Sequence, residues 1–281
     1  MSSRTTDAAA VHYRISAESP PVATRLRELW DARDLFVLLV GREIKVRYKQ
    51  TALGVAWVVV QPLVPAIIIA VVLGTFARLP SAGQPYLLFA LSGFVVFGLF
   101  ASAVSRAATA FIRDGQLVTR IYFPRALLPL ASGSASIVDF AVSFVVLIAL
   151  MFLLGQTPTP GIAAVPLVAL LTIGLALALG LAISALSAHY RDFALAVPFV
   201  LQLLLYASPV VYSMELVPAS IRPLYSLNPL VPLIEGFRSA LLGTPGPTGL
   251  EILGAAVTGS AVAAIGILVF MRASRDIADV I

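Results

Sequence analysis

The sequence predicts an all-α integral membrane protein with six transmembrane helices. Three observations predict this fold class: 59% of the 281 residues are hydrophobic, only 12% are charged, and the mean hydropathy is +0.97. Soluble domains carry about 25% charged residues. The composition therefore excludes a water-soluble globular protein, a disordered chain and a nucleic-acid-binding protein, in spite of the net charge of +5.

The first elements lie before the membrane domain. The predicted divisions are a polar segment at residues 1–30, an amphipathic helix at residues 31–50 and a membrane domain at residues 51–281. On a helical wheel Arg42, Lys45 and Lys49 form one cationic stripe, and apolar residues form a different face. This pattern is typical of a helix in the cytoplasmic headgroup layer. A generic positively charged anchor is the alternative.

Six segments are long and apolar enough to span a bilayer, which takes roughly 20 residues. They are residues 53–76, 85–105, 126–154, 161–188, 193–214 and 252–271. An apolar continuation to residue 112 predicts a longer second helix. Asp139 is the only acidic residue within the spans, and we interpret it as a hydrogen-bonded helix contact near Ser136 and Ser143. A role in transport is the alternative.

Residues 215–250 contain only short apolar runs interrupted by six prolines. We expect short re-entrant or interfacial helices between spans five and six, with an ordinary extracellular loop as the alternative. Lys and Arg residues set the orientation: fifteen lie on one side of the spans and three on the other. Cytoplasmic segments are enriched in these residues, so both termini are expected in the cytoplasm. The polar first thirty residues show no cleavable signal peptide.

Several kinds of chemistry are missing from the sequence. It has no cysteine, its two histidines are far apart, and it contains no Gly-rich phosphate-binding loop. We therefore expect no catalytic residue, no metal site and no nucleotide bound by this chain. One alternative is a membrane-embedded transferase, which would need clustered acidic or histidine residues at a membrane face. A passive channel or scaffold is a further alternative.

Aromatic residues recur along one face of the extended second span. They are Tyr86, Phe89, Phe97, Phe100 and Phe111. At ~100° per residue they fall within roughly 80° of one another, and they extend about 37 Å along the axis. Such a series offers many weak contacts to the C–H faces of sugars. Packing against lipid or neighbouring helices is the alternative.

Two further spans carry polar and aromatic side chains on one face. They are Trp57 and Gln61 in the first span, and Phe199, Gln202 and Tyr206 in the fifth. Polar groups in a span face protein or water rather than lipid, so we predict that these residues line a substrate pathway with the aromatic series. Small residues such as Gly174, Gly180 and Gly254 are interpreted as close helix contacts.

Four motifs follow one another along nearly the whole chain after residue 30. They are RYKQTALGVAW at 47–57 with QPL at 61–63, RIYFPRALLPL at 120–130, HYRDF at 189–193, and a series of SP at 208–209, NP at 228–229 and EGFR at 235–238. In order and spacing they resemble the permease subunit of ABC exporters that move O-antigen, teichoic acid and related glycans. The resemblance implies ATP-driven export of lipid-linked polysaccharide from the cytoplasmic side across a bacterial inner membrane. A small-molecule or drug exporter of the same class is the alternative.

The resemblance also implies partners and residue roles. It implies a homodimer of six-helix chains, joined by two copies of a separate subunit that binds ATP and Mg. The implied contacts with that ATPase subunit are the N-terminal helix and Arg113, Asp114, Arg120 and Arg125. Glu235 and Arg238 would close the outer end of the channel. Arg42, Arg47 and Lys49 would guide the pyrophosphate of the lipid-linked glycan, although plain phospholipid anchoring also explains these three cations.

Overall fold

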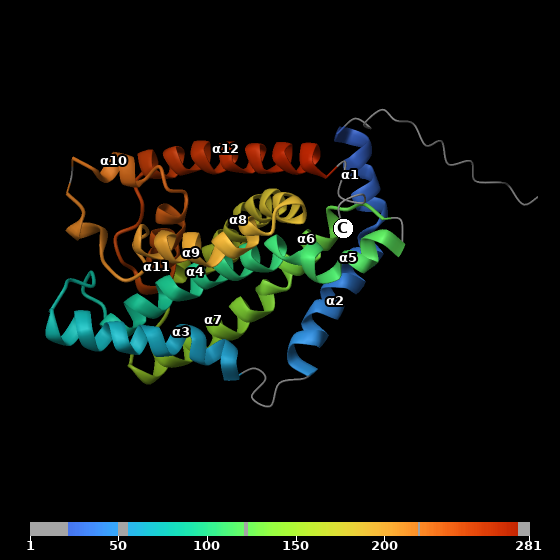
Figure 1. The fold of residues 1–281 in the computed structure, drawn as a ribbon. Coiled ribbons are helices and arrows are strands. Elements are labelled where there is room, and N and C mark those ends of the chain that lie inside the picture. Colours follow the sequence, from blue (N-terminus) through green and yellow to red (C-terminus); the bar gives the residue numbers. More distant parts are fainter. Residues whose placement is uncertain (1–21, 50–55, 121–122, 219, 275–281) are drawn as a thin grey trace, which may run out of the picture.

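The computed structural model describes residues 22–49, 56–120, 123–218 and 220–274, and within these ranges the chain is helical without β-strands (Figure 1). Five stretches are long and apolar enough to cross a membrane. They are Ala56–Phe76, Tyr86–Gly115, Leu127–Leu153, Pro160–His189 and Gly249–Ala273. They correspond to five of the six predicted spans, and the all-helical membrane fold is confirmed.

The fifth predicted span is shorter than expected. The prediction was a helix over residues 193–214, but α9 covers Asp192–Tyr206 and a turn follows. Pro209 lacks a backbone N–H and disfavours helical geometry at Ser208, which accounts for the early end. Fifteen residues rise about 22 Å, less than the ~30 Å of a bilayer core. The described residues thus contain five long spans and one shorter apolar helix.

The helix α4 (Tyr86–Ala108) forms the centre of the bundle. It contacts α3 (Ala56–Ile69), α6 (Leu127–Ser134), α7 (Ser136–Leu153), α8 (Val165–His189), α9 and α11 (Leu230–Leu242). Most of its side chains are buried. In contrast, α12 (Gly249–Ala273) packs on α8 and exposes apolar residues such as Leu253 and Val257 on its other side. Exposed aliphatic side chains of this kind suit contact with lipid.

Two long spans continue through a change of geometry. The chain leaves α4 at Thr109 and continues as α5 (Ala110–Arg120), which has a kink at Asp114, so the predicted extension of the second span is confirmed. Beyond Ile69, α3 passes into a π-helical stretch, η1 (Ala70–Phe76). Its Ala77 N–H bonds the carbonyl of Val72, five residues back, at 3.0 Å. Prolines 62 and 65 lie within α3 itself.

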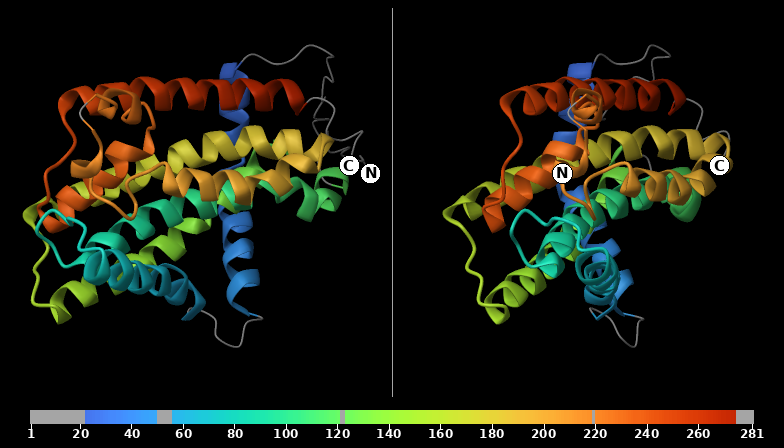
Figure 2. Two further views of the ribbon diagram at one scale, coloured as in Figure 1. Left: turned by 60° about the vertical axis from the view of Figure 1, so that its left-hand side comes forward. Right: turned by 90° about the vertical axis from the view of Figure 1, so that its left-hand side faces the viewer.

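Short helices occupy the two ends of the bundle. At one end α1 (Val22–Asp31) and α2 (Arg33–Lys49) run across the ends of the long helices (Figures 1 and 2). At the opposite end lie η3 (Met214–Leu216), α10 (Arg222–Tyr225) and α11, beside η2 (Pro160–Ala164). We call these the α2 end and the α11 end. Gly243 ends α11 with a φ of 70°, a left-handed conformation that glycine adopts without steric cost.

Candidate functional site

A carboxylate on α7 fastens the C-terminal half of α2 to the spans. Asp139 Oδ2 lies 2.6 Å from Arg47 Nη1 and 3.2 Å from Arg106 Nη2. The Tyr48 hydroxyl donates to Asp139 Oδ1 at 2.7 Å. Burial, together with this hydrogen bond, raises the pKa of Tyr48 to about 12, so the phenol remains a donor. A shielded carboxylate requires such partners, and here they join α2, α4 and α7 at one point.

A second cluster fastens α2 to α5 and α6. Arg113 Nη2 donates to Glu43 Oε2 at 2.8 Å and to Ser132 Oγ at 2.9 Å. The Nε of Arg113 donates to Asp114 Oδ2 at 3.0 Å, and Arg42 donates to the other oxygen of that carboxylate. Asp114 is the residue at the kink of α5. The two clusters together fix α2 to four other helices.

The local sequence explains how α2 presents these groups. Leu39, Glu43 and Arg47 recur every four residues, so they share one face of the helix. Leu39 packs against Leu127 and Ala131 of α6, which aligns the polar residues of the same face with their partners. This face differs from the cationic stripe that the sequence suggested.

Two of the three predicted headgroup-guiding cations are therefore engaged within the protein. Arg42 pairs with Asp114, and Arg47 pairs with Asp139. Lys49 is exposed, as is Lys45. Arg42 retains a buried nitrogen, Nη1, without a hydrogen-bond partner among the described residues. Within the predicted stripe of Arg42, Lys45 and Lys49, the carboxylate of Asp114 on α5 therefore pairs with Arg42, whereas both lysines stay exposed.

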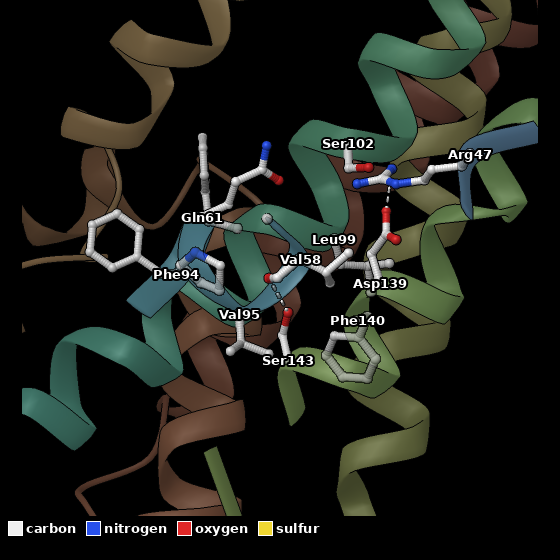
Figure 3. Close-up of a pocket in the computed structure, with 13 residues that line it drawn as sticks. Arg47, Val58, Gln61, Phe94, Val95, Leu99, Ser102, Asp139, Phe140 and Ser143 are labelled. Atoms are coloured by element: carbon white, nitrogen blue, oxygen red, sulfur yellow. Dashed lines mark hydrogen bonds and ion pairs between the residues drawn. The ribbon is translucent and has the colours of Figure 1, made fainter. Parts of the chain in front are cut away.

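A cavity adjoins the Asp139 cluster between α3, α4 and α7 (Figure 3). It has a volume of about 150 Å³. Arg47, Ser102 and Asp139 form its polar wall, while Phe94, Val95 and Leu99 are among its apolar lining residues. The Ser143 hydroxyl, also in the wall, donates to the carbonyl of Val58 at 3.4 Å. A water takes up about 30 Å³ of liquid volume, so the space accommodates a few waters or one small polar group.

The aromatic series of the second span belongs mostly to the protein core. Phe89, Phe100 and Phe111 are at most 2% exposed, and Phe97 is buried but reaches the cavity. Tyr86 is half-buried and donates to the carbonyl of Val211 at 2.7 Å. The prediction of an open aromatic pathway along this face is thus wrong for the fully buried rings, because neighbouring helices cover them.

The predicted residues of the first and fifth spans have a different environment. Trp57, Gln61, Phe199, Gln202 and Tyr206 are all exposed. Gln61 lines the cavity, whereas the three residues of α9 do not. Within one chain the three predicted faces therefore do not meet in a single pathway.

At the α11 end Glu235 and Arg238 form an ion pair of 2.9 Å. Arg238 is completely buried, and its guanidinium also donates to the carbonyls of Pro209 and Val210, each at 2.5 Å, and of Phe89 at 3.2 Å. Its Cζ lies 3.7 Å from the centre of the Phe89 ring. Burial raises the pKa of Glu235, while the charge of Arg238 opposes that shift. This pair ties α11 to α4.

The remaining predicted contacts lie near the α2 end. Arg125 donates to the carbonyl of Ser274 beyond α12. Arg120 is the last residue of α5, and its side chain lies outside the described residues, as do positions 50–55 of the first motif. Among the residues with described side chains, no group of three acidic, histidine or cysteine residues is arranged to hold a metal ion.

Sequence reasoning missed four members of the two clusters: Glu43, Tyr48, Arg106 and Ser132. A signal for two of them existed, because a lone carboxylate within a span demands a cationic or hydrogen-bonding partner. Arg106 is in the last turn of α4, the preceding span, and Glu43 is spaced regularly from Leu39 and Arg47. Which helix faced Asp139 depended on tertiary packing.

The fold and these features define a multi-pass membrane protein with short helices at both ends of its bundle. A sequence profile described as "ABC-2 type transporter" matches residues 34–242. The chain belongs to this family of ABC transporter membrane proteins, and membership implies an ATP-binding partner subunit.

Two relatives with similar sequences share one name. An O-antigen export system permease protein RfbA of Klebsiella pneumoniae is 26% identical over 250 residues, covering 88% of this chain and 95% of the relative. A protein of the same name from Myxococcus xanthus is 28% identical over 216 residues, covering 76% of this chain and 82% of the relative. Both are named as permeases, which are membrane components of transporters.

Proposed function

We propose that this chain is the channel-forming subunit of an ATP-driven exporter that moves lipid-linked polysaccharide from the cytoplasmic side across the bacterial inner membrane. The observation that carries the mechanism is the double attachment of α2 to the spans through Asp139 and Arg113. The names of the relatives, O-antigen export permeases, support the substrate class.

The proposed assembly contains two copies of this chain and two ATP-binding subunits. ATP and Mg bind in the partner, this chain binds no cofactor, and both termini face the cytoplasm. The partner contacts the α2 end, where Arg113, Asp114, Arg120 and Arg125 lie on or after α5. When nucleotide binding displaces this end, the ion pairs of α2 transmit the displacement to α4 and α7. Hydrolysis thereby drives the movement of rigid helices.

The lipid-linked substrate approaches along α2. A groove of about 630 Å³ follows this helix, lined by apolar residues such as Val37, Leu38 and Val46 and by Lys45 and Lys49. Such a surface combines contact for a lipid chain with cations for a pyrophosphate. Lys49 and the partly exposed guanidinium of Arg42 serve the headgroup, whereas Arg47 acts on α7 through Asp139. Glu235 and Arg238 hold the outer gate at the other end.

Export of a small molecule or drug is a second candidate function. The burial of Phe89, Phe100 and Phe111 removes the argument that an aromatic series guides a polymer. The cavity at Asp139 has the scale of a small solute.

The test combines purification with ATPase measurements. The tagged chain is purified from its native membranes in mild detergent and is expected to carry an ATPase subunit in equal amount. The complex is then reconstituted in vesicles, and ATP hydrolysis is measured with lipid-linked glycans and, separately, with amphipathic drugs. Stimulation by the glycans alone supports the proposal. Stimulation by drugs alone favours the second candidate, and purification without any ATPase contradicts both.

A further inference from the structure

A second cavity lies at the α11 end of the molecule, away from Asp139. It has a volume of about 230 Å³ and is lined by residues of η3, α10, α11 and the loop that leads into α12. Three carboxylates line it, those of Glu215, Glu235 and Glu251, together with one cation, Arg222. Burial raises the pKa of Glu235, and the charges of Glu251 and Glu215 raise it further. The three acids therefore lie close enough for the charge of two to affect the third.

These polar groups retain capacity for a ligand. Among the described residues the carboxylate of Glu215 has no hydrogen bond or ion pair, and Arg222 uses only its Nε, which donates to the carbonyl of Val217 at 3.0 Å. One oxygen of Glu251 caps α12 through Thr248, at 2.7 and 2.9 Å, which leaves the second oxygen. Carboxylates accept hydrogen bonds and a guanidinium donates them, so the cavity offers both functions.

A buried hydroxyl in the wall is unsatisfied. Thr244 is 5% exposed and lines the cavity, and its Oγ1 has no hydrogen-bond partner among the described residues. Buried hydroxyl groups normally have a partner, and one without it indicates a missing group. A ligand hydroxyl seated against this wall supplies that partner.

The lining selects among ligand classes. Three carboxylates repel a phosphate or another anion, and among the described residues no three acids are arranged to hold a metal ion. Residues such as Pro232, Pro245 and Val231 supply apolar contacts beside the polar groups. The volume is below the ~300 Å³ at which sites for drug-sized ligands begin and equals that of several waters at ~30 Å³ each. These properties suit one small ring that bears several hydroxyl groups and apolar C–H faces.

We infer that this cavity binds a single saccharide ring at the end of the bundle opposite α2. Its hydroxyls donate to Glu215 and Glu235, accept from Arg222 and satisfy Thr244, and its C–H faces contact the proline rings. The inference rests on the proposed export of polysaccharide and adds a place where a sugar unit is held at the α11 end. Because Glu235 also anchors Arg238, an occupant contacts the pair that ties α11 to α4.

The experiment is saturation-transfer NMR on the purified full-length chain in nanodiscs. The probes are the methyl glycosides of glucose, galactose, mannose, rhamnose and N-acetylglucosamine, each added singly. At least one is expected to receive saturation from the protein. Glu215→Gln and Thr244→Val are both expected to weaken that binding about tenfold or more, which corresponds to about 1.4 kcal/mol or more. Glu28→Gln on α1 and Thr258→Val on α12 are matched controls and should leave it unchanged.

The variants are first checked for an unchanged unfolding temperature. Thr244→Val removes a hydroxyl that has no partner, so it should not destabilise the chain, and a loss of binding then reports the ligand contact. The inference is overturned if no glycoside binds, if both variants bind as the wild type does, or if only divalent cations bind. Export assays separate the two proposals: export by the wild type without glycoside binding refutes this inference alone, and glycoside binding without export refutes the proposed function.

Discussion

At the scale of single residues, Arg238 shows how much one buried cation organises. Its guanidinium satisfies the carboxylate of Glu235 and three backbone carbonyls, and it lies over the ring of Phe89. Carbonyls at a chain turn have no helical partner of their own, and burial without one is costly. The arginine therefore stabilises the turn at residues 209–210 as well as the contact between α11 and α4.

Replacing Arg238 should strongly lower the stability of the fold. Arg238→Ala leaves Glu235 and the carbonyls unpaired, and breaking a buried ion pair costs roughly 3–5 kcal/mol. Arg238→Lys should lie between alanine and the wild type, because a lysine cannot reproduce the planar fork of donors. Thermal unfolding in detergent measures both. The exposed Arg222→Ala is the control, and equal unfolding temperatures for both alanine variants would contradict the assignment.

A glycine beside Arg238 offers a second test. A Cβ at Gly93 would lie 2.5 Å from the carbonyl oxygen of Val210 and 2.6 Å from Arg238 Nη2, so Gly93→Ala should destabilise the fold by about 1–3 kcal/mol. Gly98 lies on the same helix with nothing within 4 Å of a Cβ. Gly98→Ala should instead be neutral or stabilise by up to ~1 kcal/mol. Unfolding temperatures that fall equally in both variants would count against the close packing.

At the scale of elements, α2 is attached to the rest of the bundle at two points. Ion pairs near its middle join it to α5, whose Arg113 also donates to Ser132 of α6. Near its end Arg47 pairs with Asp139 of α7, which also pairs with Arg106 of α4. The apolar contact of Leu39 with α6 supports the first attachment. Under the proposed function, we expect a displacement of α2 to reach both the kinked end of the second span and the third span.

Asp139→Asn should uncouple these elements. The asparagine keeps hydrogen-bonding capacity but removes the charge shared by Arg47 and Arg106, and losing charge-assisted hydrogen bonds costs roughly 1.5–3 kcal/mol. In the reconstituted complex, ATP hydrolysis should continue while glycan export falls. Ser143→Ala, one turn along α7, should retain export. If Asp139→Asn exports at the wild-type rate, the attachment does not transmit movement.

Much of the element pattern was predictable from the sequence. Apolar length located five spans, and the spacing of prolines indicated short helices between the fifth and sixth predicted spans. The partners of these elements were not predictable, because they depend on which helices become neighbours. Thus Phe89 and Phe100 form a regular face, yet α4 lies at the centre and both are buried. Gly180 is a close contact as predicted, whereas Gly174 has open space around it.

At the scale of the whole molecule, the two ends of the bundle differ in chemistry. The α2 end carries ion pairs and exposed lysines, and the α11 end carries a buried arginine and a cavity lined by carboxylates. The long helices between the ends expose aliphatic side chains. This polarity suits a transporter whose two membrane faces have separate tasks.

The orientation can be measured directly, because the native chain has no cysteine and gives no background. If α9 and its following turn complete a sixth crossing, Ser220→Cys should react with a membrane-impermeant maleimide in intact cells. Asp192→Cys and Glu28→Cys should react only after the membrane is opened. Reaction of Ser220→Cys and Asp192→Cys from the same side would place α9 outside the set of crossing helices.

The π-helical stretch at the end of α3 links the rotation of the residues beyond it to its own hydrogen bonding. A π turn holds one residue more than an α turn, so the segment from Ala70 to Phe76 contains extra chain length within a continuous series of backbone hydrogen bonds. Returning it to α-helical bonding turns every residue beyond it by about 100° and advances them about 1.5 Å along the axis. The side chain of Phe76 would then point to a different side of the helix axis.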